Sequence, residues 1–294
     1  MSDIYIPIWA NSISFKAYLL ESKITCDDLK SKITPFLANI KRKKEGWTSA
    51  SPQELDESKI ACFQYVKFTK NANSTRLSGT QQFSSDGCGI IFDFENNIIM
   101  PTTSSSQKLA SMVERHAFKP VYDLSGVRAF SYSGDFLYWL AYRYETGAKG
   151  ISENISIKDL IALLGDEGDE GGVSNFLKAN TDVSKDMRTK ILLGSFDRLS
   201  LIHIDVDYNG KTYGFDLRED GRIKVETPDE MDLLEKFEYA KKVHTIVVGS
   251  HKEYKDFLKL NTWKKLKDGF KVSQLSIGHS AISELLKKLG PQAK

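Results

Sequence analysis

The chain has 294 residues, of which 40% are hydrophobic and 27% are charged, and its formal net charge is +2. This composition is typical of a folded globular protein and argues against intrinsic disorder. Three widely spaced cysteines, Cys26, Cys62 and Cys88, argue against a disulfide framework or a zinc ribbon, and no apolar run approaches the roughly 18 residues of a membrane span, so we expect a cytoplasmic protein without a membrane partner.

The N-terminal half combines strand and helix signals. Alternating apolar residues and runs of aromatic and β-branched residues indicate strands, whereas capping residues and apolar residues at helical spacing indicate helices. On these signals we expect strands at residues 4–8, 59–70, 89–94 and 97–100, and helices that begin near Thr25 and cover 104–116 and 136–144. The polar residues 71–87 are expected to form a long loop.

A helical signal follows at residues 156–164. Ile157, Leu160, Ile161 and Leu164 recur at i, i+3, i+4 and i+7, and Ser156 is a suitable N-cap. We therefore expect a helix here.

The clearest local pattern predicts a three-stranded antiparallel meander at residues 199–226. Alternating apolar residues lead into Asn209-Gly210, which is a typical two-residue hairpin turn and places Ile204 opposite Phe215. A second turn at 219–221 keeps the apolar side chains of the third strand on the same face. That buried face is expected to contain Ile204, Val206, Tyr213, Phe215, Ile223 and Val225.

Beyond the meander, capping residues alternate with apolar runs. We expect a helix from Thr227 to about Lys242, a strand at 243–248, a helix that Ser250 and Glu253 open as a capping box, and a last helix at 280–289.

These elements predict an α+β fold, a largely antiparallel sheet with flanking helices. We expect an N-terminal lobe at 1–150 and a C-terminal lobe at 151–294, with the boundary between residues 147 and 172. The second lobe begins acidic and ends basic: residues 151–240 carry 11 basic and 20 acidic side chains, whereas 241–294 carry 12 lysines, no arginine and four acids. This asymmetry is the strongest global signal of the sequence.

The basic segment is the candidate site for a ligand. Lysine is a flexible point charge that suits phosphates, and a tryptophan among lysines can stack on bases. We predict a nucleic-acid-binding surface made of Lys252, Lys255, Lys259, Trp263, Lys264, Lys265, Lys267 and Lys271. Two alternatives stay open: a solvated helix face, or docking of the basic segment on the acidic segment of the same chain.

A second candidate is the polar face of the meander. His203, Asp205 and Asp207 alternate on the first strand, and the hairpin register places Asp216 opposite His203. An imidazole and carboxylates on one rigid surface can bind a divalent cation, although this is also how the wet face of an antiparallel sheet looks. The sequence contains no phosphate-binding glycine loop and no nucleophile elbow, so we assign no catalytic residue and expect no cofactor.

The leading interpretation is therefore a non-enzymatic nucleic-acid-binding protein without strong sequence preference. Lysines outnumber arginines 32 to 9, a bias that suggests AT-rich coding DNA and an accessory or defence component of a bacterial mobile region. The alternatives are a metal-dependent hydrolase, such as a nuclease, that uses His203, Asp205, Asp207 and Asp216, and a protein-binding subunit of a complex.

Overall fold

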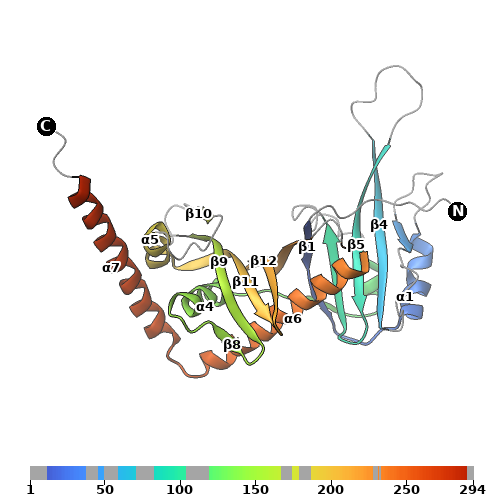
Figure 1. Ribbon diagram of the computed structural model, residues 1–294. Helices are drawn as coiled ribbons and strands as arrows, with labels where there is room; N and C mark the ends of the chain where they lie inside the picture. Colours follow the sequence, from blue (N-terminus) through green and yellow to red (C-terminus); the bar gives the residue numbers. More distant parts are fainter. Residues whose placement is uncertain are drawn as a thin grey trace, which may run out of the picture. The chain divides into compact units, whose positions relative to one another are not determined.

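Aromatic and β-branched runs form most of the strands where the sequence predicts them, and the fold is α+β with a large antiparallel sheet and flanking helices (Figure 1). The computed structural model describes residues 12–37, 46–49, 59–70, 83–103, 119–166, 174–178, 187–227, 231 and 233–289. The expected strand at 4–8 and the expected helix at 104–116 lie outside these residues. The chain divides into two compact units: unit 1 is Met1–Phe130 with Gly221–Lys241, and unit 2 is Ser131–Asp220 with Lys242–Lys294.

The sheet of unit 1 runs in the order β13-β1-β6-β5-β4-β3, with β2 pairing with β6 and β7. Its strands are β1 (Ser12–Lys16), β2 (Tyr18–Leu20), β3 (Gly46–Ser49), β4 (Ile60–Lys70), β5 (Phe83–Asp93), β6 (Ile98–Thr103), β7 (Val127–Ala129) and β13 (Arg222–Glu226). Two short helices accompany it, α1 (Cys26–Ile33) and α3 (Lys119–Tyr122), with a 3-10 turn at Thr34–Phe36. The strands expected at 59–70, 89–94 and 97–100 are confirmed, but β5 begins at Phe83, so the expected loop at 71–87 ends earlier.

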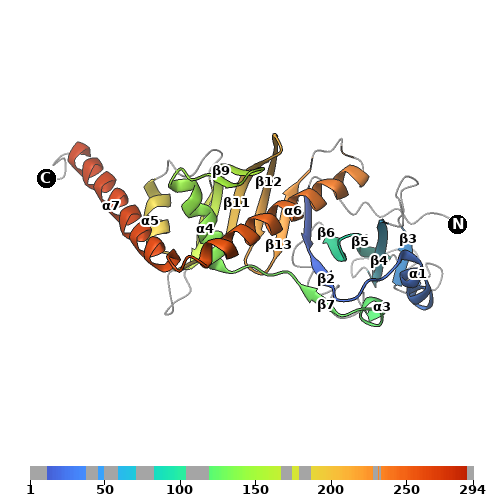
Figure 2. The ribbon, with the colours of Figure 1, turned by 90° about the horizontal axis from the view of Figure 1, so that it is seen from below.

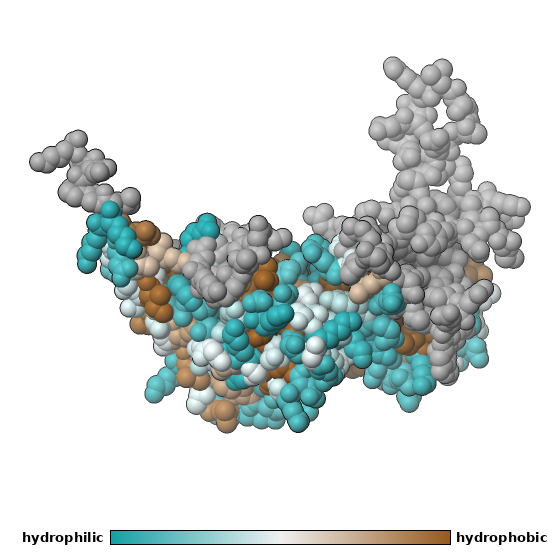
Figure 3. Space-filling model, in the orientation of Figure 1, coloured by the Kyte–Doolittle hydropathy of each residue, from teal (hydrophilic) through white to brown (hydrophobic). Residues whose placement is uncertain are grey.

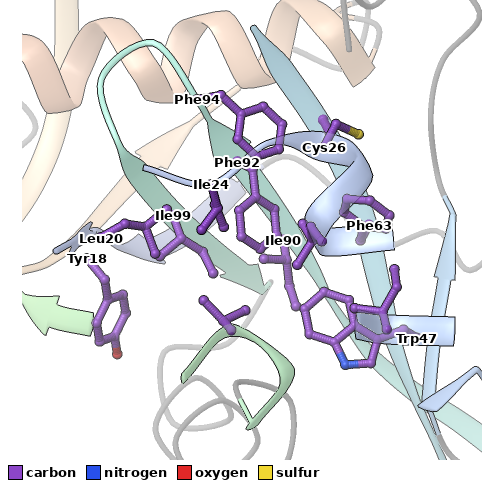
Figure 4. Close-up of a cluster of buried hydrophobic side chains, with 14 of the residues drawn as sticks. Tyr18, Leu20, Ile24, Cys26, Trp47, Phe63, Ile90, Phe92, Phe94 and Ile99 are labelled. Carbon is purple, nitrogen blue, oxygen red and sulfur yellow. The ribbon is translucent and has the colours of Figure 1, made fainter. Parts of the chain in front are cut away.

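The core of unit 1 is a cluster of aromatic and aliphatic side chains between the sheet and α1 (Figure 4). Trp47 of this cluster is 1% exposed and makes edge contacts with Phe63 and Tyr65. The helix expected to begin near Thr25 is α1, and Thr25 caps it, because its hydroxyl accepts from the Asp28 backbone N–H while the Asp28 carboxylate accepts from the Thr25 backbone N–H.

Unit 2 is built on the sheet β10-β9-β11-β12, and β8 adds to the outside of β9. Its elements are α4 (Gly134–Glu145), β8 (Gly150–Ser152), β9 (Ile155–Asp166), β10 (Ser174–Lys178), α5 (Met187–Ser195), β11 (Arg198–Tyr208), β12 (Lys211–Arg218), the greater part of α6 (Leu233–Leu258) and α7 (Trp263–Leu289). Figure 2 shows α4 lying along β9 and β11, which it contacts. The expected lobe boundary, between residues 147 and 172, lies inside unit 2. That residues 1–150 and 151–294 form two lobes stays a prediction.

The three strands expected at 199–226 are all present. The first hairpin has the predicted register, with Ile204 opposite Phe215 and His203 opposite Asp216, and Asn209 and Gly210 have the positive φ values that this turn requires. All six side chains expected on the buried face are at most 6% exposed. The alternation of buried and polar residues therefore fixed this part of the fold correctly.

The helix expected from Ile157 to Leu164 is wrong, because these residues belong to β9. Two β-bulges explain the misleading spacing. In the pairing of β9 with β11, Lys158 and Ile161 are skipped. Each extra residue shifts the alternation, so Ile157 and Leu160 both face the core, three positions apart rather than two or four. A strand with two bulges thereby imitates the apolar period of a helix.

The strand expected at 243–248 and the capping box at Ser250 are also wrong, because α6 runs without interruption from Leu233 to Leu258. Val243, Ile246 and Val247 are buried at i, i+3 and i+4, so packing of one helical face outweighs the strand preference of β-branched residues. The Ser250 hydroxyl donates to the Ile246 carbonyl within the helix instead of capping one. Likewise, α7 begins at Trp263, well before the residues 280–289 that the sequence indicates.

An aromatic cluster joins α4 to α6 in unit 2, and it contains one histidine. The His251 ring lies 5.0 Å from the rings of both Tyr132 and Phe136, and it stacks on Tyr254. Burial, assisted by the nearby Lys255, lowers the pKa of His251 to about 4. The imidazole therefore serves as a neutral aromatic packing group at neutral pH.

We predict that His251 makes unit 2 sensitive to acid. Because its pKa is lower in the folded state than the ordinary value near 6.5, the unfolded chain takes up the proton first, and stability is lost as the pH falls from about 6.5 towards 4. Since the side chain is partly exposed, solvent screening reduces the effect to about 1–2 kcal/mol. Urea unfolding at pH 7 and pH 4.5 should show a smaller loss for His251→Phe than for the unchanged chain. Equal losses in both proteins would contradict this assignment.

Candidate functional site

Five of the predicted lysines surround the bend between α6 and α7. Lys252 and Lys255 lie in the last turns of α6, Lys259 lies in the connection, and Lys264 and Lys265 lie in the first turn of α7. All five side chains are exposed. We call these five residues the corner lysines.

A buried tryptophan anchors the bend. Trp263 is 6% exposed, and its ring makes edge contacts with Tyr138, Tyr142 and Phe257. The indole therefore holds α7 against α4 and the end of α6, and it does not present a free face on which a base could stack. Asn261 adopts a positive φ of 55° in the connection, which turns the chain sharply.

The other two predicted lysines are engaged within unit 2. Lys267 Nζ lies 2.6 Å from Asp135 Oδ1 and 2.5 Å from the Asp197 carbonyl, and it sits over the Tyr138 ring. Lys271 Nζ lies 2.7 Å from Asp197 Oδ1, and this hydrogen bond lowers the Asp197 pKa. These two lysines hold α7 to the start of α4 and to the loop before β11. Of the alternatives that the sequence left open, docking on the acidic segment describes the Lys271–Asp197 pair.

The acidic residues near the corner reduce its charge only in part. Asp256 forms an exposed ion pair with Lys259, with 2.5 Å between Oδ1 and Nζ. Glu253 and Asp268 are the other acids of this stretch of chain. The corner lysines thus keep an excess of positive charge, in a place where water and solutes have access.

The polar sheet face contains one tight pair. His203 Nδ1 lies 2.7 Å from Asp216 Oδ1, and both side chains are about a quarter exposed, 21% and 26%. Asp207 has a local role, since its carboxylate accepts from the Gly210 backbone N–H in the hairpin turn. The face therefore orients the imidazole, as the register predicted, and uses Asp207 to close the turn.

Asp205 lies between His203 and Asp207 on β11, and its ionised carboxylate is in an unfavourable electrostatic environment. It stands opposite Gly214 on β12 and opposite Asp159 on β9. A Cβ atom at position 214 would come within 2.7 Å of its carboxylate, so the glycine leaves room for that group. Burial and the neighbouring Asp159 raise the Asp205 pKa, while His203 and Lys158 oppose the shift.

This geometry does not gather metal ligands. Among the residues that the structure describes, no three His, Cys, Asp or Glu side chains lie close enough together to hold a metal ion. Cys26 and Cys62 are buried and form no disulfide bond. The polar face offers the hydrolase alternative a histidine–aspartate pair and one desolvated carboxylate.

Sequence reasoning missed the partners that decide which lysines are free. Asp135 and Asp197 are separated from Lys267 by 132 and 70 positions along the chain, so no local pattern connects them. The one usable signal was that Asp135 lies directly before the helix expected at 136–144, near a helix N-terminus, where an acid is favoured for its own reasons.

Comparisons with known proteins give no further indication of function. No protein-family model and no curated protein matches the chain. In the described part of the chain, no helix is both long and apolar enough to cross a membrane.

We predict that Asp205→Asn stabilises the protein at neutral pH. The raised pKa means that the folded state prefers the neutral acid, so the charged form costs stability above that pKa and the cost disappears as the pH falls. Because the site is open to solvent, the gain at pH 7 should stay below about 1 kcal/mol. Urea unfolding should show this gain at pH 7 and its loss near pH 4. A less stable variant at pH 7 would show that the carboxylate makes a contact worth more than its desolvation.

Proposed function

We propose that the protein binds DNA or RNA through the corner lysines, with affinity for the phosphate backbone and little preference for sequence. The observation that supports this proposal is the exposure of all five corner lysines around a bend that the buried Trp263 anchors. A fixed scaffold with flexible cationic side chains can follow a phosphate backbone without large ordering costs.

The residue types favour contacts to phosphates over contacts to bases. Residues 241–294 contain no arginine, which is the side chain that most often reads guanine in the major groove. Since Trp263 is buried, stacking on bases does not contribute at this position. Affinity should therefore come from counterion release and should fall steeply with salt.

We predict that log affinity for a duplex of arbitrary sequence falls with log salt at a slope near −4, which corresponds to about four lysines on phosphates. The double change Lys264→Glu and Lys265→Glu should weaken binding equally for unrelated sequences and should bring the slope closer to zero by about 2. Fluorescence anisotropy over a range of salt concentrations measures both quantities.

The control for this experiment keeps the change in net charge and moves it elsewhere. Lys23→Glu with Lys32→Glu alters two exposed lysines of unit 1 at and beside α1, and it should leave the slope almost unchanged. Lys267 and Lys271 are left out of the test because their reversal would place a carboxylate against Asp135 or Asp197 and disturb the packing of α7. Absence of binding at low salt, or an equal loss of affinity in the test variant and the control variant, would contradict the proposal.

The other interpretations of the sequence require tests of their own. For the metal-dependent hydrolase, calorimetry with Mn²⁺ decides, since that mechanism requires binding that Asp205→Asn removes. The role as a bacterial accessory or defence component and the cytoplasmic location stay predictions. The role as a protein-binding subunit of a complex stays a prediction as well.

A further inference from the structure

The connection between α6 and α7 presents a leucine to solvent. Leu260 is 65% exposed, and Leu258 and Leu266, before and after it in the chain, are 36% and 37% exposed. Figure 3 shows apolar surface where α6 ends and α7 begins, with hydrophilic side chains around it. A single exposed leucine is ordinary, so its significance depends on what surrounds it.

Backbone hydrogen bonds hold Leu260 in this position. Its N–H donates to the Phe257 carbonyl at 3.1 Å, and the N–H of Asn261 donates to the Leu258 carbonyl at 3.0 Å. Asn261 then turns the chain with its positive φ, and the buried Trp263 anchors the residues that follow. A hydrogen-bonded turn therefore presents the leucine, which reduces the cost of ordering it when a ligand binds.

The corner lysines lie on both sides of this leucine along the chain. Three of them precede it, with Lys259 as its direct neighbour, and two follow it at the start of α7. A polyanion that contacts both groups of lysines passes over the connection and meets Leu260. Such a ligand has to offer phosphates to the lysines and an apolar surface to the leucine.

We propose that Leu260 packs on the face of a nucleic-acid base while the corner lysines hold the neighbouring phosphates, so that the protein prefers single-stranded DNA or RNA to duplex. This inference rests on the proposed function and names the class of nucleic acid that it serves. The face of a base is the apolar part of a nucleotide, and every base has one. Because leucine has no hydrogen-bonding group in its side chain, the contact adds affinity without a preference for sequence.

A duplex does not offer this apolar surface on its outside. Its base faces are stacked, and phosphates, sugars and base edges are what a protein meets first. An apolar side chain reaches the base faces of a duplex only by unstacking a step, and that cost has to be repaid by a larger contact with bent DNA. A single strand exposes its base faces without this cost. One well-exposed leucine between lysines therefore fits the single strand better.

A lipid surface also combines anionic groups with an apolar interior, but it fits the corner less well. Binding to a bilayer grows with the apolar area that enters it, and Leu260 is the one corner leucine that is more than half exposed. Glu253, Asp256 and Asp268 also lie in this stretch of chain, and a broad anionic surface would meet them together with the lysines. A strand is narrow and can follow the lysines alone.

Fluorescence anisotropy with a labelled single strand of mixed sequence, and with the duplex of that sequence, provides the test. The salt slope measures contacts of lysines with phosphates, and the affinity extrapolated to about 1 M salt measures the remaining contacts. This extrapolated affinity should be about fivefold or more higher for the strand than for the duplex. Leu260→Ser should lower the strand affinity about fivefold without changing the slope, and should change the duplex affinity less than about twofold.

A second change at the same position should have the opposite sign. Leu260→Trp should raise the strand affinity about threefold or more, because an aromatic ring stacks on a base more strongly than leucine does. The matched control is Val272→Ser, which removes an apolar side chain of similar exposure, 68%, next to a lysine that is paired with Asp197. It should leave both affinities unchanged. Urea unfolding checks that the variants keep the stability of the unchanged chain.

Failure of this inference is distinguishable from failure of the proposed function. If strand and duplex both bind with the expected salt slope but Leu260→Ser leaves the strand affinity unchanged, the lysines bind phosphates and the leucine contact is overturned. If neither nucleic acid binds at low salt, both proposals are overturned. Cosedimentation with vesicles of phosphatidylcholine and phosphatidylserine tests the lipid alternative. Vesicle binding that Leu260→Ser abolishes, with an unchanged strand affinity, would assign the leucine to lipid and overturn the inference too.

Discussion

The burial of α4 is the constraint on which the architecture of unit 2 depends. Six consecutive residues, from Phe136 to Ala141, are at most 2% exposed. A helix that is apolar on every side must be enclosed on every side. The sheet strands β9 and β11 cover part of it, and aromatic side chains of α6 and α7 cover the rest through Tyr254, Phe257 and Trp263. The bend between α6 and α7, and with it the corner lysines, is placed by this need for enclosure.

The elements that the sequence predicts are those that local signals determine, and the elements that it misses depend on tertiary structure. The hairpin of β11 and β12 is fixed by a local turn and by strict alternation, both of which are visible in the sequence. In β9 the bulges at Lys158 and Ile161 respond to the neighbouring strand, and no local signal marks them. Val243 to Val248 form a helix because the buried face of α6 continues through them, which only the tertiary structure determines.

The candidate site divides in the same way. The sequence identifies the lysines, because charge composition is a property of the chain itself. It does not tell exposed lysines from paired ones, since Lys267 and Lys271 are paired through acids that only folding brings near. Trp263 shows this most clearly. From the sequence alone, a tryptophan between lysines is a suitable stacking residue. In the fold, packing against Tyr138 and Tyr142 buries it.

The residues of α7 divide their roles along the helix. Lys264 and Lys265 in its first turn are exposed, whereas Lys267 and Lys271 further along the helix pair with Asp135 and Asp197. In the middle of the helix, Leu275 and Gly278 meet Gly194 and Ile191 of α5 at close range. Screening by salt weakens contacts of exposed lysines with phosphates but has little effect on apolar packing of this kind. One helix can thus hold unit 2 together along its length and present charge at its start, because different residues meet the two requirements.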